Sequence, residues 1–220
     1  MNKKKVLYFV LMFVPLMITL VALPLLPETI PAHYNFEGEI DRFGSKYETL
    51  IFPLCTVLMG VFMLRMAKFA AKQEENGSNN EKAVFYTGMG ISVWFTIMHC
   101  WSLYKAFAAA GSMSYSDPVD INQIFCILFG IGMVIIGNFM PKLRTNSVIG
   151  LRTVWSMKNE TTWKKSQFFG GVSFIVCGIF IIAAGLFLEG IAAMFAALGL
   201  LITDTIVCVI YSYKVAKKYQ

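Results

Sequence analysis

Apolar residues fill this chain in six long runs, and short polar stretches separate the runs. Each run is about 20 residues long, which matches the helix length needed to cross a hydrocarbon core of roughly 30 Å. We therefore expect an all-α integral membrane protein with six transmembrane helices. The predicted helices cover residues 6–26, 49–71, 83–108, 123–140, 167–188 and 191–211.

The first apolar run follows Lys3, Lys4 and Lys5, and a basic start of this kind is also typical of a secretory signal peptide. Signal peptides have apolar regions of only about 7–15 residues, followed by a cleavage site with small residues. This run is longer and lacks such a site, so it predicts a retained helix. Pro15 is expected to kink the helix, which neighbouring membrane helices tolerate.

The polar stretch 27–48, between the first two helices, predicts a small β-hairpin outside the membrane. Residues 30–35 alternate partly between apolar and polar, residues 36–39 are turn-like, and residues 40–43 can pair back on the first strand.

Two other polar stretches, 72–82 and 111–122, predict solvated loops. The turn at Glu189 and Gly190 is so short that the last two helices must be antiparallel neighbours. We divide the chain into two units with one loop each: 1–71 with the outer loop 27–48, and 83–220 with the inner loop 141–167.

Composition and charge agree with a membrane protein. Hydrophobic residues make up 57% of the chain and charged residues 15%, whereas an ordinary soluble domain is roughly 45–50% apolar and about 25% charged. If the N-terminus is cytoplasmic, 16 of the 19 Lys and Arg residues fall on the inner side, as the positive-inside rule favours. Both termini are therefore expected inside (N-in/C-in). The net charge of +6 then reflects topology and contact with the anionic lipid bilayer, not nucleic acid.

Few residues are candidates for metal or catalytic chemistry. All five cysteines lie in apolar runs without CxxC spacing, which is typical of small buried hydrophobic residues. The chain has no Walker, GxGxxG or HExxH motif, and we predict no cofactor and no metal. His33 lies near Asp41 in the outer loop, where hydrogen bonds that stabilise the hairpin are the first interpretation and metal or peptide binding the second.

Asp204 is the one acidic residue deep inside an apolar run, where an unpaired carboxylate is costly. Arg65 lies at a similar predicted depth near the inner end of the second helix, so we expect an Arg65–Asp204 pair. The alternatives are a substrate or proton path and a water-filled cavity open to the cytoplasm. Asn138 or Arg152 is also placed to reach toward Asp204.

Small and aromatic residues suggest how the helices pack. Gly171, Gly178 and Gly185 recur every seven residues and so form a stripe of small residues on the fifth helix. Ala192, Ala193, Ala196 and Ala197 form a similar stripe on the last helix, so we expect these two helices to approach closely. His99 lies among tryptophans, where a hydrogen-bonded packing role is favoured over a ligand role.

The stretch 137–171 interrupts the membrane pattern with six basic residues and two tryptophans. Pro141 should end the helix that precedes it. Asn146 and Gly150 are expected to adopt positive φ in turns, and Asn159 is a candidate N-cap for the next helix. We therefore expect this loop to fold compactly.

Four side chains of this loop are candidates for a functional surface. Arg144 and Arg152 either bind a partner or snorkel to the lipid headgroups. Trp155 and Trp163 fit an interfacial aromatic belt.

Two sets of residues resemble a known family. The inner set resembles the signature of the SdpI family, bacterial membrane proteins of immunity to a secreted peptide toxin, and the outer set resembles a small domain of unknown function often found at the N-terminus of these proteins. The inner set is Gly137–Lys142, Asn146, Ile149–Thr153, Trp155, Trp163–Lys165 and Gly170–Gly171; the outer set is Leu26–Pro27, Ile30–Pro31, His33–Asn35, Gly38 and Asp41–Arg42. Val154 stands where the family usually has Pro, and Gln167 where it often has His.

The resemblance implies a multi-pass protein of the bacterial cell membrane that protects against a membrane-active peptide toxin and signals to a cytoplasmic repressor. We expect a binding protein, not an enzyme. The peptide would meet the outer side, with His33, Asn35 and Asp41 as candidates, and a regulatory protein would meet the inner loop.

Two other functions remain open at this stage. A small-solute or ion-coupled transporter would use Asp204, Arg65 and Asn138 to line a path, but the sequence has no inverted repeat or broken-helix pair. A membrane enzyme would need His33, His99 and Asp204 to converge from three different depths.

Overall fold

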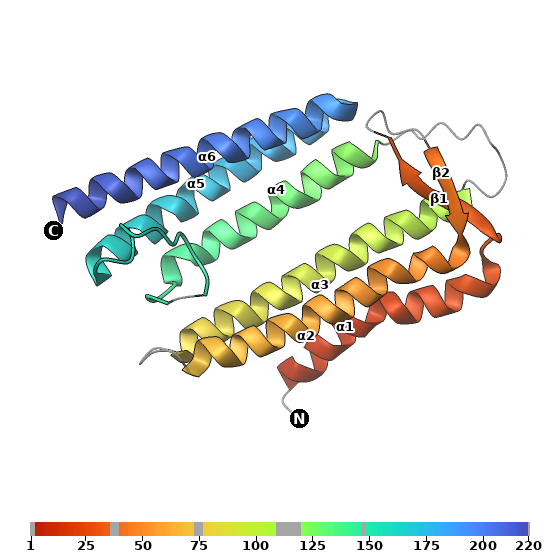
Figure 1. Cartoon of the computed structure of the whole chain (residues 1–220), viewed down its shortest axis with the longest axis horizontal. Coiled ribbons are helices and arrows are strands. Elements are labelled where there is room, and N and C mark those ends of the chain that lie inside the picture. The colour runs from red at the N-terminus through yellow and green to blue at the C-terminus, as the bar shows by residue number, and fades with distance from the viewer. Residues whose placement is uncertain (1–2, 36–39, 73–76, 109–119, 147, 220) are drawn as a thin grey trace. The chain divides into compact units, whose positions relative to one another are not determined.

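The computed structural model describes residues 3–35, 40–72, 77–108, 120–146 and 148–219. Within these residues, six helices are long and apolar enough to cross a membrane, which confirms the predicted fold class (Figure 1). The helices are α1 (Lys3–Ala22), α2 (Ile51–Lys72), α3 (Gly77–Ala108), α4 (Ile121–Phe139), α5 (Glu160–Phe187) and α6 (Gly190–Lys218).

The three largest differences from the predicted helix ends are at the starts of α3 and α5 and at the end of α6. Helix α3 begins at Gly77, so part of the predicted solvated loop 72–82 is helical. Helix α5 begins at Glu160 and not at residue 167, because Asn159 caps it. The N-cap itself agrees with the prediction. Helix α6 continues to Lys218 because its last turns carry lysines that a helix tolerates outside the apolar region.

The chain forms two compact units, one of residues 1–63 with 88–121 and the other of residues 64–87 with 122–220. Helices α2 and α3 each contribute to both. The predicted division into 1–71 and 83–220 stays a prediction.

In the first unit, small residues allow α1, α2 and α3 to pack closely. The Tyr8 side chain is fully buried, and its hydroxyl donates a hydrogen bond to the carbonyl oxygen of Gly60 over 3.0 Å. A methyl group at Gly88 would lie 2.3 Å from the same hydroxyl oxygen. Glycine is thus required where Tyr8 crosses the other two helices.

The predicted hairpin between the first two helices is confirmed, and its strands follow the end of α1 in Figure 1, while its place on the outer side of the membrane stays a prediction. Strands β1 (Thr29–Tyr34) and β2 (Ile40–Ser45) pair antiparallel. Short 3₁₀ turns, η1 (Leu23–Leu25) and η2 (Lys46–Leu50), join them to α1 and α2. The predicted turn at 36–39 lies outside the described residues, as does most of the predicted loop at 111–122.

A small apolar cluster attaches β1 to the helices of its unit. Ile30 of β1 is buried with residues that end α1 and α3: Ala22, Leu26, Leu103 and Ala106. The hairpin is therefore fixed to its unit through β1.

In the second unit, α5 and α6 form the predicted antiparallel hairpin. The predicted partner of the glycine stripe is wrong, however, because the stripe faces α4. A methyl group at Gly178 would lie 2.6 Å from the carbonyl oxygen of Gly130, and one at Gly171 would lie 2.5 Å from that of Gly137. Helix α4 has its own glycines at this spacing, and these let the two backbones touch.

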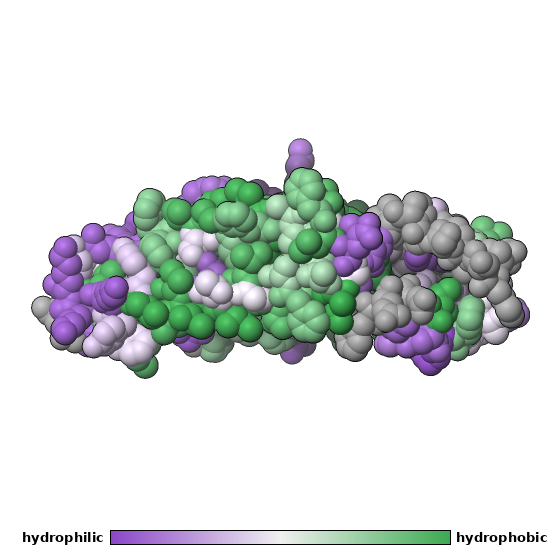
Figure 2. Space-filling model, turned by 90° about the horizontal axis from the view of Figure 1, so that it is seen from above, coloured by the Kyte–Doolittle hydropathy of each residue, from purple (hydrophilic) through white to green (hydrophobic). Residues whose placement is uncertain are grey.

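The core of α4, α5 and α6 lies beside this glycine contact. It consists of Cys126, Met133, Cys177, Ile181, Ala193 and Ala197. Cys126, Cys177 and Cys208 are buried and act as small apolar residues in this core or next to it, as predicted, whereas the prediction of burial is wrong for Cys55 and Cys100, which are exposed. Figure 2 shows the outer surface of one face, where hydrophobic residues cover the middle and hydrophilic residues gather toward the ends.

The α4–α5 contact predicts a sharp difference between two neighbouring glycines. Gly130→Ala should lower the free energy of unfolding by about 1–3 kcal/mol, because the added methyl group overpacks the crossing. Gly132→Ala is the matched control, since nothing lies within 4 Å of a methyl group there. Thermal unfolding in detergent measures both, and equal midpoints for the two variants would contradict this packing.

Candidate functional site

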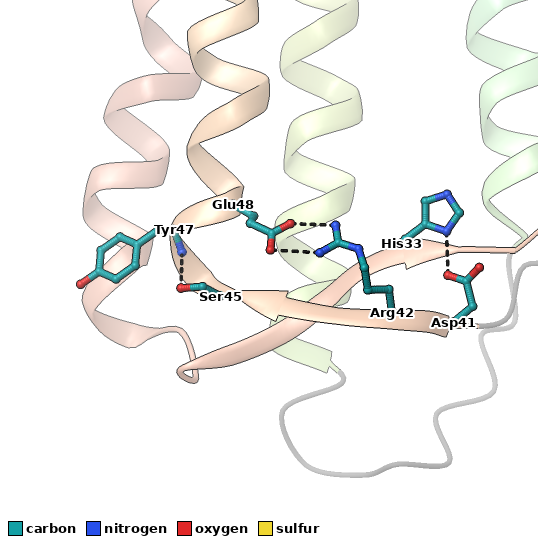
Figure 3. A network of polar contacts seen from close by, with 6 residues as sticks. All are labelled: His33, Asp41, Arg42, Ser45, Tyr47 and Glu48. Carbon is teal, nitrogen blue, oxygen red and sulfur yellow. Dashed lines mark hydrogen bonds and ion pairs between the residues drawn. The ribbon is translucent and has the colours of Figure 1, made fainter.

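The outer hairpin carries a network of charged pairs (Figure 3). His33 Nδ1 lies 2.6 Å from Asp41 Oδ1, so the hydrogen bond expected between these candidates is present. Arg42 binds both carboxylate oxygens of Glu48, at 3.2 and 2.8 Å. The hydrogen bond with Glu48 and its negative charge raise the pKa of Arg42.

A second set of contacts ties the hairpin to α3. The Lys105 ammonium lies 5.4 Å from the ring centre of Tyr34 and 5.6 Å from that of Trp101. The Lys105 side chain is buried here. Cation–π attraction compensates for part of the lost hydration. Burial also raises the pKa of Tyr34. Asn35 directly follows β1 and is half-buried.

The inner loop between α4 and α5 is compact, as predicted. Pro141 lies in a 3₁₀ turn (η4, Met140–Lys142) that ends α4. The predicted positive φ of Gly150 is confirmed at 110°, whereas that of Asn146 is wrong. Asn146 is needed for its side chain instead: its Oδ1 accepts from the backbone N–H groups of Val148 and Ile149, and its Nδ2 donates to the Arg144 carbonyl oxygen.

Two side chains of α5 hold the loop in place. Trp163 is fully buried and donates from Nε1 to the carbonyl oxygen of Leu143 over 2.8 Å. Gln167 is also fully buried, and its amide accepts from the N–H of Leu151 and donates to its carbonyl oxygen, both over 2.9 Å. The predicted place of Trp163 in an interfacial belt is therefore wrong, because its ring packs inside the loop with Met140 and Leu143.

The loop is also bonded to α6. The hydroxyls of Thr153 and Ser212 lie 2.9 Å apart. Asn159 forms a reciprocal capping box with Thr162, and its side-chain amide donates to the Tyr219 carbonyl oxygen over 3.1 Å. Trp155 packs edge-on against Tyr213. Residues 151–159 therefore connect the start of α5 to the end of α6.

The other loop candidates are exposed. Arg144 has Glu160 at 3.7 Å, while Arg152 and Asn138 project from the surface. Val154, between Arg152 and Trp155, is 77% exposed. The loop thus presents cations and the apolar side chains of Val154 and Met157 on a backbone held by hydrogen bonds.

Asp204 has a different partner from the one predicted. Ser173 donates a hydrogen bond to Asp204 Oδ1, and Cys208 Sγ lies 4.0 Å from Oδ2. The predicted Arg65–Asp204 pair is wrong, because the buried carboxylate of Asp204 faces Ser173 of α5 instead. Arg65, by contrast, is exposed near the end of α2.

Ser173 and Gln167 are contacts that the sequence analysis missed. Both are polar residues in a run otherwise suited to lipid, which is the signal that could have identified them. The candidates at Asn138, Arg152 and Arg65 do not reach Asp204 in the described structure.

His99 is a packing residue, as predicted. Its Nε2 lies 2.6 Å from the hydroxyl of Thr19, which itself donates to the carbonyl oxygen of Pro15. Nε2 is therefore the donor in this pair. Within the described residues, no group of three or more His, Cys, Asp or Glu is arranged to hold a metal ion.

Comparison with known proteins finds similarity in two segments, one that contains the hairpin and one that contains most of the inner loop. Residues 142–212, from the inner loop through most of α6, match the SdpI/YfhL protein family. The second half of the chain therefore carries a segment similar to the SdpI/YfhL family. Residues 10–57, which include the outer hairpin, match a domain of unknown function, DUF1648.

The chain is also similar to individual proteins. It is 25% identical over 216 residues to "Immunity protein SdpI" of Bacillus subtilis (strain 168), which covers 98% of this chain and 97% of that protein. It is 44% identical over 43 residues to an uncharacterized protein of Archaeoglobus fulgidus, or 20% of this chain and 24% of that one. No solved structure matches. The six helices and this kinship identify a multi-pass protein of the cell membrane.

Gln167→Leu should loosen the inner loop, because it removes both bonds to Leu151 and leaves buried backbone groups without a partner. The expected loss is about 1–3 kcal/mol of local stability, seen as roughly tenfold or faster hydrogen exchange at residues 148–156. Phe168→Leu is the control, since that side chain is exposed. Unchanged exchange in the Gln167 variant would show that these bonds do not hold the loop.

The Ser173–Asp204 bond predicts unequal effects of its two substitutions. Ser173→Ala should lower stability in the membrane by about 0.6–2 kcal/mol, whereas Asp204→Asn should have little effect because the amide oxygen still accepts from Ser173. Thr203→Ala is the control, since its hydroxyl bonds only within α6 among the described residues. Unfolding in mixed micelles compares the three, and a loss for Asp204→Asn as large as for Ser173→Ala would contradict the assignment.

Proposed function

We propose that this chain is a membrane immunity protein that protects its own cell against a secreted, membrane-active peptide toxin. The observation that carries the proposal is similarity along nearly the whole chain to a protein named for immunity. The similarity includes both extramembrane structures, the outer hairpin and the inner loop, together with all six helices.

The mechanism in this proposal is binding, without any bond being made or broken. The hairpin is attached to its unit by Ile30 and by Lys105, so it is a fixed structure and not a loose loop. A peptide that approaches from the outer side meets the hairpin before it meets the ends of the helices.

The inner loop is suited to report binding to a cytoplasmic regulatory protein. It is bonded to α5 through Gln167 and to α6 through Thr153 and Asn159. A small shift of α6 against α5 would therefore strain the loop and change how it presents Arg152 and Val154. The exposed cations favour an acidic partner surface.

Transport is less well supported as an alternative. Its charged path required Arg65, Asn138 and Asp204 to line one route, but Asp204 is bonded to Ser173 while the other two are exposed elsewhere.

Expression of the full chain should protect a sensitive cell against a cognate peptide toxin. The expected result is a several-fold rise in the toxin concentration that stops growth, because the bound peptide no longer permeabilises the membrane. Vector alone and Gly130→Ala, which weakens the fold, serve as controls. Absence of protection against every peptide made by the source strain and its neighbours would refute the proposal.

A further inference from the structure

Strand β2 is the exposed strand of the outer hairpin. The sheet has two strands in the described structure, so β2 has β1 on one side only. Strand β1 is attached to the helices through Ile30, whereas Asp41, Arg42 and Phe43 of β2 are all exposed. A strand with one unpaired edge presents free N–H and C=O groups that can pair with another extended chain.

The regular part of this edge is short. The pairing of the two strands shifts between Pro31 and Tyr34, and this irregularity leaves Asp41 without a direct cross-strand partner. From Phe43 to Ser45 the pairing is regular, with Phe43 opposite Pro31. These three residues offer a docking edge of limited length, which favours a peptide over a whole sheet.

The charge of the hairpin specifies the kind of peptide. Residues 27–48 contain five acidic and two basic residues, a formal charge of −3, in a chain whose net charge is +6. Both cations are already neutralised, Arg42 by Glu48 and Lys46 by Glu28 at 2.9 Å. The carboxylate of Glu28 remains mostly exposed. The hairpin therefore attracts a cationic chain and repels a second copy of itself.

Two aromatic side chains flank the same edge. Phe43 is 54% exposed and Tyr47 is 59% exposed. In strand addition, main-chain hydrogen bonds provide affinity, while alternate side chains of the added strand contact the neighbouring surface. Phe43 and Tyr47 offer contact to the apolar residues of an amphipathic peptide, and the carboxylates offer contact to its cations.

We propose that a cationic, amphipathic peptide adds to β2 as a third strand, along Phe43–Ser45. This inference rests on the proposed function and names the surface that receives the toxin. Membrane-active peptides commonly combine lysine or arginine with apolar residues, which is the chemistry this edge accepts. Strand addition holds the peptide at the outer surface in an extended form that cannot insert as a helix.

The test uses the full chain in nanodiscs of zwitterionic phosphatidylcholine, with empty nanodiscs as the background. The probe is a labelled eight-residue peptide that alternates Lys and Val, and fluorescence anisotropy measures its dissociation constant. Two matched peptides separate the contribution of main-chain pairing from that of charge. One has N-methyl groups on alternate residues, which block pairing, and the other alternates Glu and Val, which reverses the charge. We expect binding of the Lys–Val peptide at least tenfold tighter than binding of either control.

Protein variants locate the site. Glu28→Gln combined with Asp41→Asn should weaken binding several-fold, whereas Glu189→Gln, an exposed carboxylate outside the hairpin, should not. Infrared spectra of a ¹³C=O-labelled peptide should show the band of a paired strand on binding. Equal binding of the N-methylated and the unmethylated Lys–Val peptide, no binding, or a stable dimer that occupies the edge would overturn the proposal.

Growth protection separates this inference from the proposed function. Protection that persists without strand pairing would refute the β2 site and leave immunity standing. Strand pairing without protection would support the β2 site and refute immunity.

Discussion

The inner loop depends on one constraint: backbone groups that leave the helical pattern near a membrane need other hydrogen-bond partners. Trp163 donates to the carbonyl oxygen of Leu143, and the Gln167 amide bonds both the N–H and the carbonyl oxygen of Leu151. The Asn146 side chain accepts from two N–H groups of the turn that follows it. With these groups satisfied, the chain can leave α4, form a compact loop and enter α5. The exposed cations of the loop then have a rigid support.

Close backbone contact is the second feature on which the structure depends. The glycines of α4 and α5 remove side chains where the two helices cross, so the carbonyl of one helix touches the α-carbon of the other. Large apolar side chains are left for the lipid-facing surface. The stripe of small residues therefore belongs to α4–α5 packing, while α5 and α6 meet through the apolar core and the short turn that joins them.

The sequence predicted the elements well and the partners less well. Hydrophobic runs set the number of helices, and strand alternation located the hairpin, because these patterns depend on local periodicity. The partner of the glycine stripe could not be predicted in this way, since small residues on α5 are compatible with either neighbour. The Asp204 pair was also misassigned, because it was inferred from similar depth alone, and depth does not say which side chains of two helices face each other. Trp163 and Gln167 could have been recognised as partners of the loop backbone only from the fold of the loop itself.

The bond between Ser173 and Asp204 has a consequence for how this protein is made. A helix with a carboxyl group at its midpoint enters a bilayer poorly by itself. Helix α5 is synthesised before α6, and the turn between them is only a few residues long. Its serine is therefore already available when Asp204 emerges from the ribosome, and the two helices are suited to enter the bilayer together as a preformed pair.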